Sequence, residues 1–478
     1  MNTKTKNLMQ VCRLLEDNAS TDQKWRPKFH LSPRTGWMND PNGLCRFNRV
    51  YHIFFQYSPY NTCPGTNFWG HFTTKDFISY EYRKPALCVD EKFDCHGVYS
   101  GSAIAEDGKM YLFYTGNVKL CGKDYDYVTG GREHNTVIAV SEDGIVFPEK
   151  QMLMDNSDYP ESCTCHVRDP KVFKLDGVYY MVLGARRIDD TGEVLVFESK
   201  DKYEWKHINT LNSKEKFGFM WECPDLFELD GQWFLSVSPQ GVEAEGYKYN
   251  NVYQSGYFPL SGDFRGDYTL GEFTELDRGF DFYAPQSFED ENGRRIQIGW
   301  LGLPDLDGYY ENPTHDMGWM HMLTCPRELF RKGEKLYQYP VKELNALRRE
   351  CTERNVTGEA VISDADIFDM ETYKINSQDI EIIIREDCRI SYGNKLLTLE
   401  FGAAGRGRKS RSVQLESLDS LRILADASSV EIFANGGEEV FSSRYYPEEN
   451  QKGAIIRAEN VNTKLWKMNS FNITDLSK

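Results

Sequence analysis

The segment RDPKVFKLDGVYYMVLGAR, residues 168–186, contains the pattern that decides the fold. A short run of strand-forming residues is followed by Asp176-Gly177 and then by a second run rich in tyrosine and valine. Asp-Gly between two such runs is a typical signal for a β-hairpin. The segment therefore predicts two antiparallel strands joined by a tight turn.

The same pattern recurs along the chain. Four further segments match it: residues 39–57 (NDPNGLCRFNRVYHIFFQY), 98–117 (VYSGSAIAEDGKMYLFYTGN), 222–240 (ECPDLFELDGQWFLSVSPQ) and, more loosely, 282–302 (FYAPQSFEDENGRRIQIGWLG). The units start roughly 60 residues apart, which leaves room for about four strands each. A generic β-sandwich would explain alternating strands but not five matched starts. We therefore expect an all-β fold whose main part is a five-bladed β-propeller, over residues 25–339.

The two ends of the chain have a different character. Residues 1–24 are expected to form an N-terminal extension with a helix, on which Val11, Leu14 and Leu15 share one face. The segment PVKELNALRREC begins with proline and has apolar residues at three-residue spacing, which predicts a linker helix over residues 340–352. From residue 353 to residue 478, strands without the unit pattern predict a C-terminal β-sandwich.

Composition limits the possible functions. The chain has 478 residues, of which 40% are hydrophobic and 27% charged, as expected for a globular protein of more than one domain. Its net charge of −17 argues against binding to nucleic acid or to an anionic membrane. We identify no apolar stretch long enough for a signal peptide or a membrane span, so a cytoplasmic protein with reduced thiols is expected.

The sequence does not favour a metal or another cofactor. Among the 12 cysteines, the tightest cluster is Cys163, Cys165 and His166 in CTCH, and we find no fourth ligand at a suitable spacing. The three converging acids described next could suit a calcium ion, but no Asp-rich loop accompanies them. We therefore expect neither a metal nor a cofactor.

Acidic residues stand at three unit starts. Asp40 and Asp169 directly precede proline, and Glu222 lies one residue further back, in ECP. A residue before proline is disfavoured in the α region, so extended geometry is expected there. Because the first strand of each propeller blade lines the central channel, these carboxylates should converge on one pocket. Chance placement of common turn residues is the alternative explanation.

Aromatic residues near the unit starts favour a sugar as the ligand of this pocket. Aromatic residues make up 14% of the chain, and most of them must serve in strand packing. Hydrolysis of a glycosidic bond requires one ionised carboxylate and one carboxylic acid on opposite sides of that bond. Charge crowding and burial raise the pKa of one member of such a set.

An ordered set of short motifs resembles glycoside hydrolase family 32, the invertases and fructanases. The motifs are WMNDPNG, WGHFTTKD, YSGSA, RDP, ECPD, FYAPQSF and SSVEIF, and they extend from about residue 25 to beyond residue 430. The resemblance implies a five-bladed propeller joined to a β-sandwich. It also implies that Asp40 is the nucleophile, Glu222 the acid/base and Asp169 a stabiliser of the transition state, with retention of configuration.

The resemblance further implies a set of fructose-binding residues. They are Asn39, Gln56, Trp69, Tyr99, Ser100 and Arg168, with Tyr283 near the acid/base. The family often has phenylalanine where Tyr99 stands and a basic residue where Ala427 stands. The loop NTCPGTNFWGH also departs from the family pattern, which leaves the preference for the leaving group open.

The expected function is that of a retaining β-fructofuranosidase acting on sucrose or sucrose 6-phosphate. An exo-fructanase acting on short inulin or levan oligosaccharides, or a fructosyltransferase, would have the same fructose site and remains an alternative. A non-catalytic fructan-binding protein would lose one of the reacting acids, and Asp40, Asp169 and Glu222 are all present. The expected partner is a small sugar, and the sequence does not predict the oligomeric state.

Overall fold

The computed structural model describes residues 3–20, 22, 24–306 and 308–477, and most of them lie in strands or in the turns between strands. The five repeated units form antiparallel strand pairs, as predicted. The pairs are β1 (Gly36–Phe47) with β2 (Val50–Ser58), β5 (Val98–Glu106) with β6 (Lys109–Lys119), β9 (Cys163–Leu175) with β10 (Val178–Arg187), β13 (Met220–Leu229) with β14 (Gln232–Gln240), and β18 (Tyr283–Glu289) with β19 (Arg295–Leu301).

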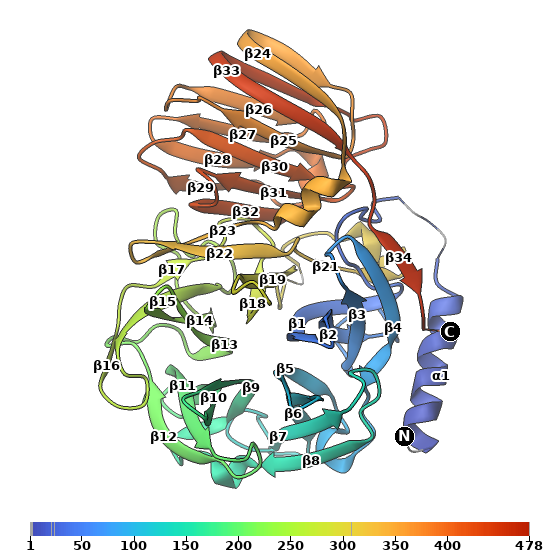
Figure 1. Ribbon diagram of the computed structural model, residues 1–478, viewed down its shortest axis with the longest axis vertical. Helices are drawn as coiled ribbons and strands as arrows, with labels where there is room; N and C mark the ends of the chain where they lie inside the picture. Colours follow the sequence, from blue (N-terminus) through green and yellow to red (C-terminus); the bar gives the residue numbers. More distant parts are fainter. Residues whose placement is uncertain (1–2, 21, 23, 307, 478) are drawn as a thin grey trace.

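Each pair belongs to a separate sheet of four to six strands. The further strands, sheet by sheet, are β3 (Phe68–Thr74), β4 (Ser79–Leu87), β20 (Trp319–Met320) and β34 (Asn472–Asp475); β7 (Arg132–Ser141) and β8 (Glu149–Met154); β11 (Gly192–Ser199) and β12 (Lys206–Leu211); β15 (Gly256–Gly262), β16 (Tyr268–Leu270) and β17 (Thr274–Glu275); and β21 (Met322–Leu323), β22 (Arg327–Lys332) and β23 (Lys335–Pro340). The sheets surround a common centre, and β1, β5, β9, β13 and β18 lie nearest to it (Figure 1). This part of the chain is a β-propeller.

The C-terminal part of the chain forms one 10-stranded, β-sandwich-like sheet. Its strands are β24 (Arg348–Ser363), β25 (Phe368–Tyr373), β26 (Ile380–Ile384), β27 (Cys388–Gly393), β28 (Leu396–Phe401), β29 (Ser410–Gln414), β30 (Ser420–Ala425), β31 (Ser429–Ala434), β32 (Glu439–Arg444) and β33 (Ala454–Met468). The long strand β33 pairs with β24, β25 and β26. Alternate residues of these strands, such as Ile382, Ile390 and Ile432, build the core of this part.

Helical structure is limited. The α-helix α1 (Thr3–Asp17) lies beside the propeller (Figure 1). The 3-10 helices of the described residues are η1 (Lys92–Asp94), η2 (Asn156–Asp158), η3 (Pro313–His315), η4 (Lys342–Leu347) and η5 (Ala403–Gly405). No helix in the described part of the chain is long and apolar enough to cross a membrane.

Helix α1 lies within the predicted N-terminal extension, of which residues 1, 2, 21 and 23 fall outside the described residues. The predicted apolar face is wrong, because Val11 and Leu14 are exposed and Glu16 is buried. The carboxylate of Glu16 accepts hydrogen bonds from the hydroxyl groups of Tyr57 and Tyr82. These bonds allow a polar residue to face the propeller.

The prediction of a linker helix over residues 340–352 is also wrong in its extent and type. Only Lys342–Leu347 are helical, as the 3-10 helix η4, and β24 begins at Arg348. Val341, Leu344 and Leu347 are all buried in the same cluster. Their spacing of three residues matches the 3.0-residue turn of a 3-10 helix better than the 3.6-residue turn of an α-helix.

Buried charges connect the propeller to the C-terminal sheet, in what we call the joint cluster. It consists of His30, Asp277, Asp281, Arg327, Arg408, Asp426, Glu431 and Arg444. Arg327 Nε donates to Glu431 at 3.0 Å, and Asp281 accepts from Arg408 and Arg444. Glu431 belongs to the SSVEIF motif, so this motif contributes a contact between the two parts of the chain.

Candidate active site

Every repeated unit has a break in its strand register at the same place. The breaks fall between Met38 and Pro41, Tyr99 and Gly101, Arg168 and Lys171, Glu222 and Asp225, and Tyr283 and Gln286. Such bulges change the direction of one or two side chains. The matched bulges therefore turn equivalent side chains of different sheets toward the centre.

The bulges contain left-handed backbone that the sequence did not predict. Asp169 has φ of 65°, Cys223 has φ of 48° and Ala284 has φ of 47°, and each of them precedes proline. The extended geometry expected for Asp169 is therefore wrong. The α region is sterically disfavoured before proline, and here the bulge selects the left-handed conformation instead.

The bulges also define which residues correspond. Asp40, Asp169 and Cys223 all stand directly before proline, whereas Glu222 stands one position earlier, as Arg168 and Tyr283 do. Glu222 is therefore equivalent to Arg168 and not to the two aspartates. We call Asp40, Asp169, Glu222 and Arg168 the acid cluster.

Asp40 is held by hydrogen bonds from its own strand β1 and from β5. Its Oδ2 accepts a hydrogen bond from Ser100 Oγ at 2.6 Å, and its Oδ1 accepts one from Asn39 Nδ2 at 3.1 Å. Asn39 is itself positioned by Trp37 Nε1, which donates to its Oδ1 at 2.9 Å. Burial raises the pKa of Asp40, the bond from Ser100 lowers it, and the charge of Glu222 raises it further.

The carboxylate of Asp169 contacts a backbone N–H group and the guanidinium group of Arg168. Its Oδ2 accepts from the backbone N–H of Cys223 at 2.9 Å and lies 3.9 Å from Arg168 Nε. The side chain is 5% exposed. Burial raises its pKa, Arg168 opposes this effect, and the charges of Glu222 and Asp40 add to it.

Glu222 accepts hydrogen bonds from three residues. Arg168 donates to Oε1 through Nη2 at 2.5 Å and Nε at 3.2 Å. Tyr283 OH and Gln240 Nε2 donate to Oε2 at 2.6 and 2.7 Å. Asp40 and Glu222 are therefore held by separate sets of donors, which is the arrangement that two carboxylates with different roles require.

The sequence interpretation missed Cys223 and Gln240. Cys223 is buried, and its Sγ lies 3.6 Å from an oxygen of Asp40 and 3.6 Å from an oxygen of Asp169. Burial and the neighbouring acids raise the pKa of this thiol, which keeps it protonated as a weak donor. Its place before Pro224, matching Asp40 and Asp169, was the available signal.

Two of the predicted fructose-binding residues, Gln56 and Trp69, donate hydrogen bonds to the backbone of β5. Gln56 Nε2 donates to the carbonyl of Val98 at 3.0 Å, and Trp69 Nε1 donates to the carbonyl of Tyr99 at 3.1 Å. Both side chains are almost fully buried. Gln56 Oε1 has no hydrogen-bond partner among the described residues, so this oxygen can still accept a bond.

The CTCH segment does not form a metal site. Cys163 Sγ contacts Glu193 at 3.6 Å, and His166 contacts Arg168 through Nδ1 and the carbonyl of Tyr127 through Nε2. Within the described residues, no group of three or more histidine, cysteine, aspartate or glutamate side chains is arranged to hold a metal ion.

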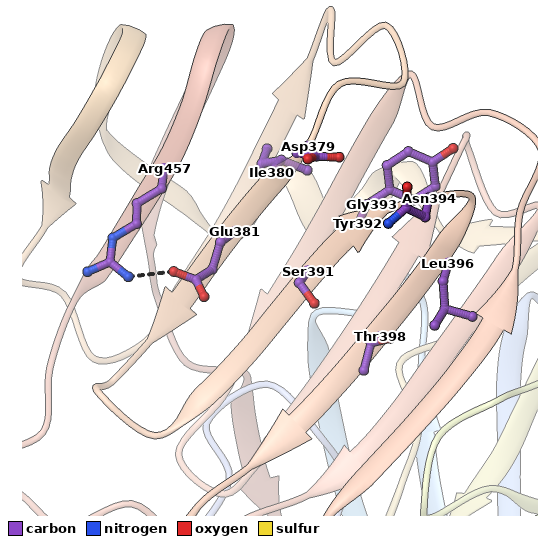
Figure 2. Close-up of a pocket in the computed structure, with 10 residues that line it drawn as sticks. All are labelled: Asp379, Ile380, Glu381, Ser391, Tyr392, Gly393, Asn394, Leu396, Thr398 and Arg457. Carbon is purple, nitrogen blue, oxygen red and sulfur yellow. Dashed lines mark hydrogen bonds and ion pairs between the residues drawn. The ribbon is translucent and has the colours of Figure 1, made fainter.

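Figure 2 shows a separate pocket of about 450 Å³ on the C-terminal sheet. Strands β26, β27 and β28 form its wall, with Ser391 and Thr398 among the lining residues. Glu381 and Arg457 pair with each other at its edge, at 2.6 Å. The pocket contains none of the acid cluster, so it is not the candidate active site.

Comparisons with known proteins identify the family of the chain. Residues 30–340 match the model for the glycosyl hydrolases family 32 N-terminal domain, and residues 401–475 match the model for the C-terminal domain of that family. The chain is 42% identical to sucrose-6-phosphate hydrolase of Bacillus subtilis, over 88% of this chain and 89% of the relative. It is 36% identical to raffinose invertase of Escherichia coli, over 92% and 94% of the two chains.

Solved structures show the same architecture. A sucrose-6-phosphate hydrolase from Lactobacillus gasseri superposes with a TM-score of 0.87 at 28% identity, over 97% of this chain and 96% of that chain. A β-fructofuranosidase from Bombyx mori superposes with a TM-score of 0.86 at 27% identity, over 99% and 100% of the two chains. The propeller with its acid cluster, the C-terminal sheet and these matches establish that the chain belongs to glycosyl hydrolases family 32.

Proposed function

We propose that this protein is a retaining β-fructofuranosidase that hydrolyses the terminal fructosyl unit of sucrose or sucrose 6-phosphate. The observation that carries the proposal is the acid cluster, in which Asp40, Asp169 and Glu222 are each held by different hydrogen-bond donors. The names of the relatives, sucrose-6-phosphate hydrolase and raffinose invertase, support the substrate class.

Asp40 is the proposed nucleophile. Its carboxylate attacks the anomeric carbon of the fructosyl unit, and the bond from that carbon to the leaving oxygen breaks. Glu222 gives its proton to the leaving oxygen. Water then attacks the fructosyl ester while Glu222 takes a proton from it, so configuration is retained and Asp40 is released. A separation of ~5–5.5 Å between the two carboxyl groups remains a prediction of this mechanism.

Asp169 stabilises the positive charge that develops on the fructosyl ring. Arg168 and the Cys223 N–H favour its ionised form, whereas burial opposes ionisation. Asn39 and Ser100 orient Asp40, and Arg168 and Tyr283 orient Glu222. Gln56, Trp69 and Tyr99 complete the proposed fructose site. In the mechanism, Asp40 forms and breaks the covalent bond to fructose, Glu222 transfers protons and Asp169 stabilises charge. The remaining residues position these acids or the sugar.

The proposed domain division is a five-bladed propeller over residues 25–339 and a β-sandwich over residues 353–478. The innermost strands β1, β5, β9, β13 and β18 contact one another in this order, and β18 contacts β1, which supports five blades in a closed ring. A cytoplasmic location stays a prediction from the sequence.

The decisive experiment measures fructose release from sucrose, sucrose 6-phosphate and 1-kestose by the purified protein. We expect the highest kcat/KM on sucrose or its phosphate, with the β-anomer of fructose as the first product in NMR spectra. A preference for 1-kestose would favour the exo-fructanase alternative. Accumulation of oligosaccharides in place of fructose would favour a transferase, and no turnover of any substrate would favour a binding protein.

A further inference from the structure

A row of cationic and imidazole side chains lies beside the acid cluster, on strands β6 and β7. Lys119 is paired with Arg132 across the two strands, and Asn117 is paired with His134. Residues paired across strands, and residues two apart in one strand, point to the same face of a sheet. Lys119, Arg132 and His134 therefore share one face.

A chain of contacts connects this face to Glu222. The ring of His134 lies 5.8 Å from that of Tyr99 and 5.6 Å from that of His166. Arg168 Nη1 donates to His166 Nδ1 at 2.5 Å, and the same guanidinium group binds Glu222. Arg168 and His166 therefore connect the row to Glu222. Because Glu222 is the proposed proton donor to the leaving oxygen, we assign the row to the leaving-group side of the site.

Among the described residues, no carboxylate forms an ion pair with Arg132 or Lys119. Within the described residues, Arg132 Nε is buried without a hydrogen-bond partner. The groups that act most strongly on Arg132 are Tyr99, Arg168, Cys165 and Tyr127, and none of them is a carboxylate. Burial and the charge of Arg132 both lower the pKa of Lys119. Positive charge is therefore concentrated here.

Another cation of the same sheet, in contrast, is paired with carboxylates. Lys150, on β8, is buried and lies 2.6 Å from Asp90 and 2.8 Å from Asp94. The carboxylate of Asp126 accepts hydrogen bonds from Val128, Thr129 and Gly130, and Asp126 is not among the groups that act most strongly on Arg132. Glu133 follows Arg132 in the strand and points to the opposite face.

His134, the third residue of the row, has a buried side chain. Its side chain is fully buried, and both ring nitrogens lack a hydrogen-bond partner among the described residues. Burial lowers the pKa of His134, so its ring is neutral, and because it is fully buried it packs in the wall and does not itself bind a ligand. Buried polar groups are normally paired, so the unpaired Nε of Arg132 beside it marks the place for a ligand with acceptor oxygens. A phosphate group offers both the negative charge and the oxygens, and an arginine fork matches its geometry.

We propose that Arg132 and Lys119 bind the phosphate of a phosphorylated leaving group, the glucosyl 6-phosphate part of sucrose 6-phosphate. This inference rests on the proposed function, because it names the leaving group of that same reaction. Arg132 is the main contact, and Lys119, which is exposed, adds longer-range attraction. The ring of His134 packs against that of Tyr99 and supports the strand from which Arg132 extends.

The test compares kcat/KM on sucrose 6-phosphate and on sucrose for Arg132→Gln, Arg132→Lys and Lys119→Gln. We expect Arg132→Gln to reduce the ratio of the two constants by about 10- to 100-fold, the usual effect of losing a hydrogen bond to a charged group. Arg132→Lys should retain part of the ratio, and Lys119→Gln should reduce it by about 3-fold. Lys109→Gln, at the other end of β6 and exposed, is the matched control and should leave the ratio unchanged.

A binding measurement makes the test independent of turnover. Calorimetry should show that the protein binds glucose 6-phosphate more tightly than glucose, and that Arg132→Gln removes this difference. An equal fall of both kcat/KM values in Arg132→Gln, with the binding difference retained, would overturn the inference. So would equal binding of the two sugars by the unchanged protein.

Failure of the proposed function has a different signature. In that case the unchanged protein would release fructose from neither sucrose nor its phosphate. The calorimetric comparison would then still decide whether Arg132 recognises phosphate.

Discussion

Two groups of buried charges, the joint cluster and the acid cluster, use the same residue types with opposite results. In the joint cluster, Asp281 accepts from both Arg408 and Arg444, and Glu431 accepts from both Arg327 and His30. Although burial raises their pKa values, these partners lower the pKa of Glu431 to about 2 and hold that of Asp281 well below its usual range.

The acid cluster has fewer cations for its acids. Arg168 is the cation in direct contact with Asp169 and Glu222, and Asp40 depends on the neutral donors Ser100 and Asn39. Burial raises the pKa values of Asp40 and Asp169. Compensation in the joint cluster is incomplete only at Asp277, where burial raises the pKa to about 6 although Arg327 opposes this. The single cation of the acid cluster fits the proposed exchange of protons and bonds.

The largest expected effect comes from removing a reacting acid. Asp40→Ala and Glu222→Gln should each lower kcat by at least about 10³-fold, because a nucleophile or a proton donor is lost. The free energy of unfolding should not fall, since crowding in the cluster is relieved. Kinetics on sucrose and urea unfolding measure both quantities.

Glu228→Gln is the matched control, because Glu228 lies on the same strand as Glu222 and is exposed. It should keep full activity. More than a tenth of the normal kcat in Asp40→Ala would remove Asp40 from its proposed role.

Next in size is the loss of a cation from the joint cluster. Arg327→Met leaves Glu431 and Asp277 without their arginine and should lower the free energy of unfolding by about 3–5 kcal/mol. Urea unfolding measures this change. Lys332→Met, at the exposed end of the same strand, should cost less than about 0.5 kcal/mol. Equal losses in the two variants would mean that the joint does not depend on charge compensation.

A smaller effect depends on pH. Burial lowers the pKa of His30, but hydrogen bonds to Asp426 and Glu431 outweigh this and raise it to about 9. Because the folded pKa is above the unfolded value of about 6.5, the stabilisation by protonated His30 is complete below pH ~6.5 and is lost as pH rises through about 9. The shift corresponds to about 3 kcal/mol.

Urea unfolding of His30→Gln and the unchanged protein at several pH values tests this sign. The difference in unfolding free energy should shrink as pH rises through about 9, the pKa of His30. His207→Gln, which removes an exposed histidine, is the control and should show no such trend. A difference that grows with pH would contradict the assignment of a protonated His30.

The smallest expected effect concerns Cys223. A hydroxyl group is a stronger donor than a thiol, so Cys223→Ser should favour the ionised forms of Asp40 and Asp169. The acidic limb of the kcat/KM profile should move to lower pH by less than about one unit. Cys63→Ser, an exposed cysteine, should leave the profile unchanged. An upward shift would contradict the donor role of Cys223.

Local patterns were enough to predict the strand pairs. Asp-Gly or Asn-Gly turns between apolar runs fix four of the five strand pairs through interactions of a few neighbouring residues. The first pair turns at Asn48-Arg49, both with positive φ, and its Asn42-Gly43 lies within β1. The linker helix failed for a related reason, because Val341, Leu344 and Leu347 satisfy a helical pattern whose period only packing could distinguish.

The sequence by itself determined the repeated units, the acids at their starts and the family motifs. The tertiary structure decided that left-handed bulges direct Asp169 and Cys223, that Glu222 corresponds to Arg168, and that Glu431 of SSVEIF serves the joint. The physical reason is that backbone direction at a bulge and charge compensation both depend on neighbours from other sheets. Those neighbours lie tens to hundreds of residues away along the chain.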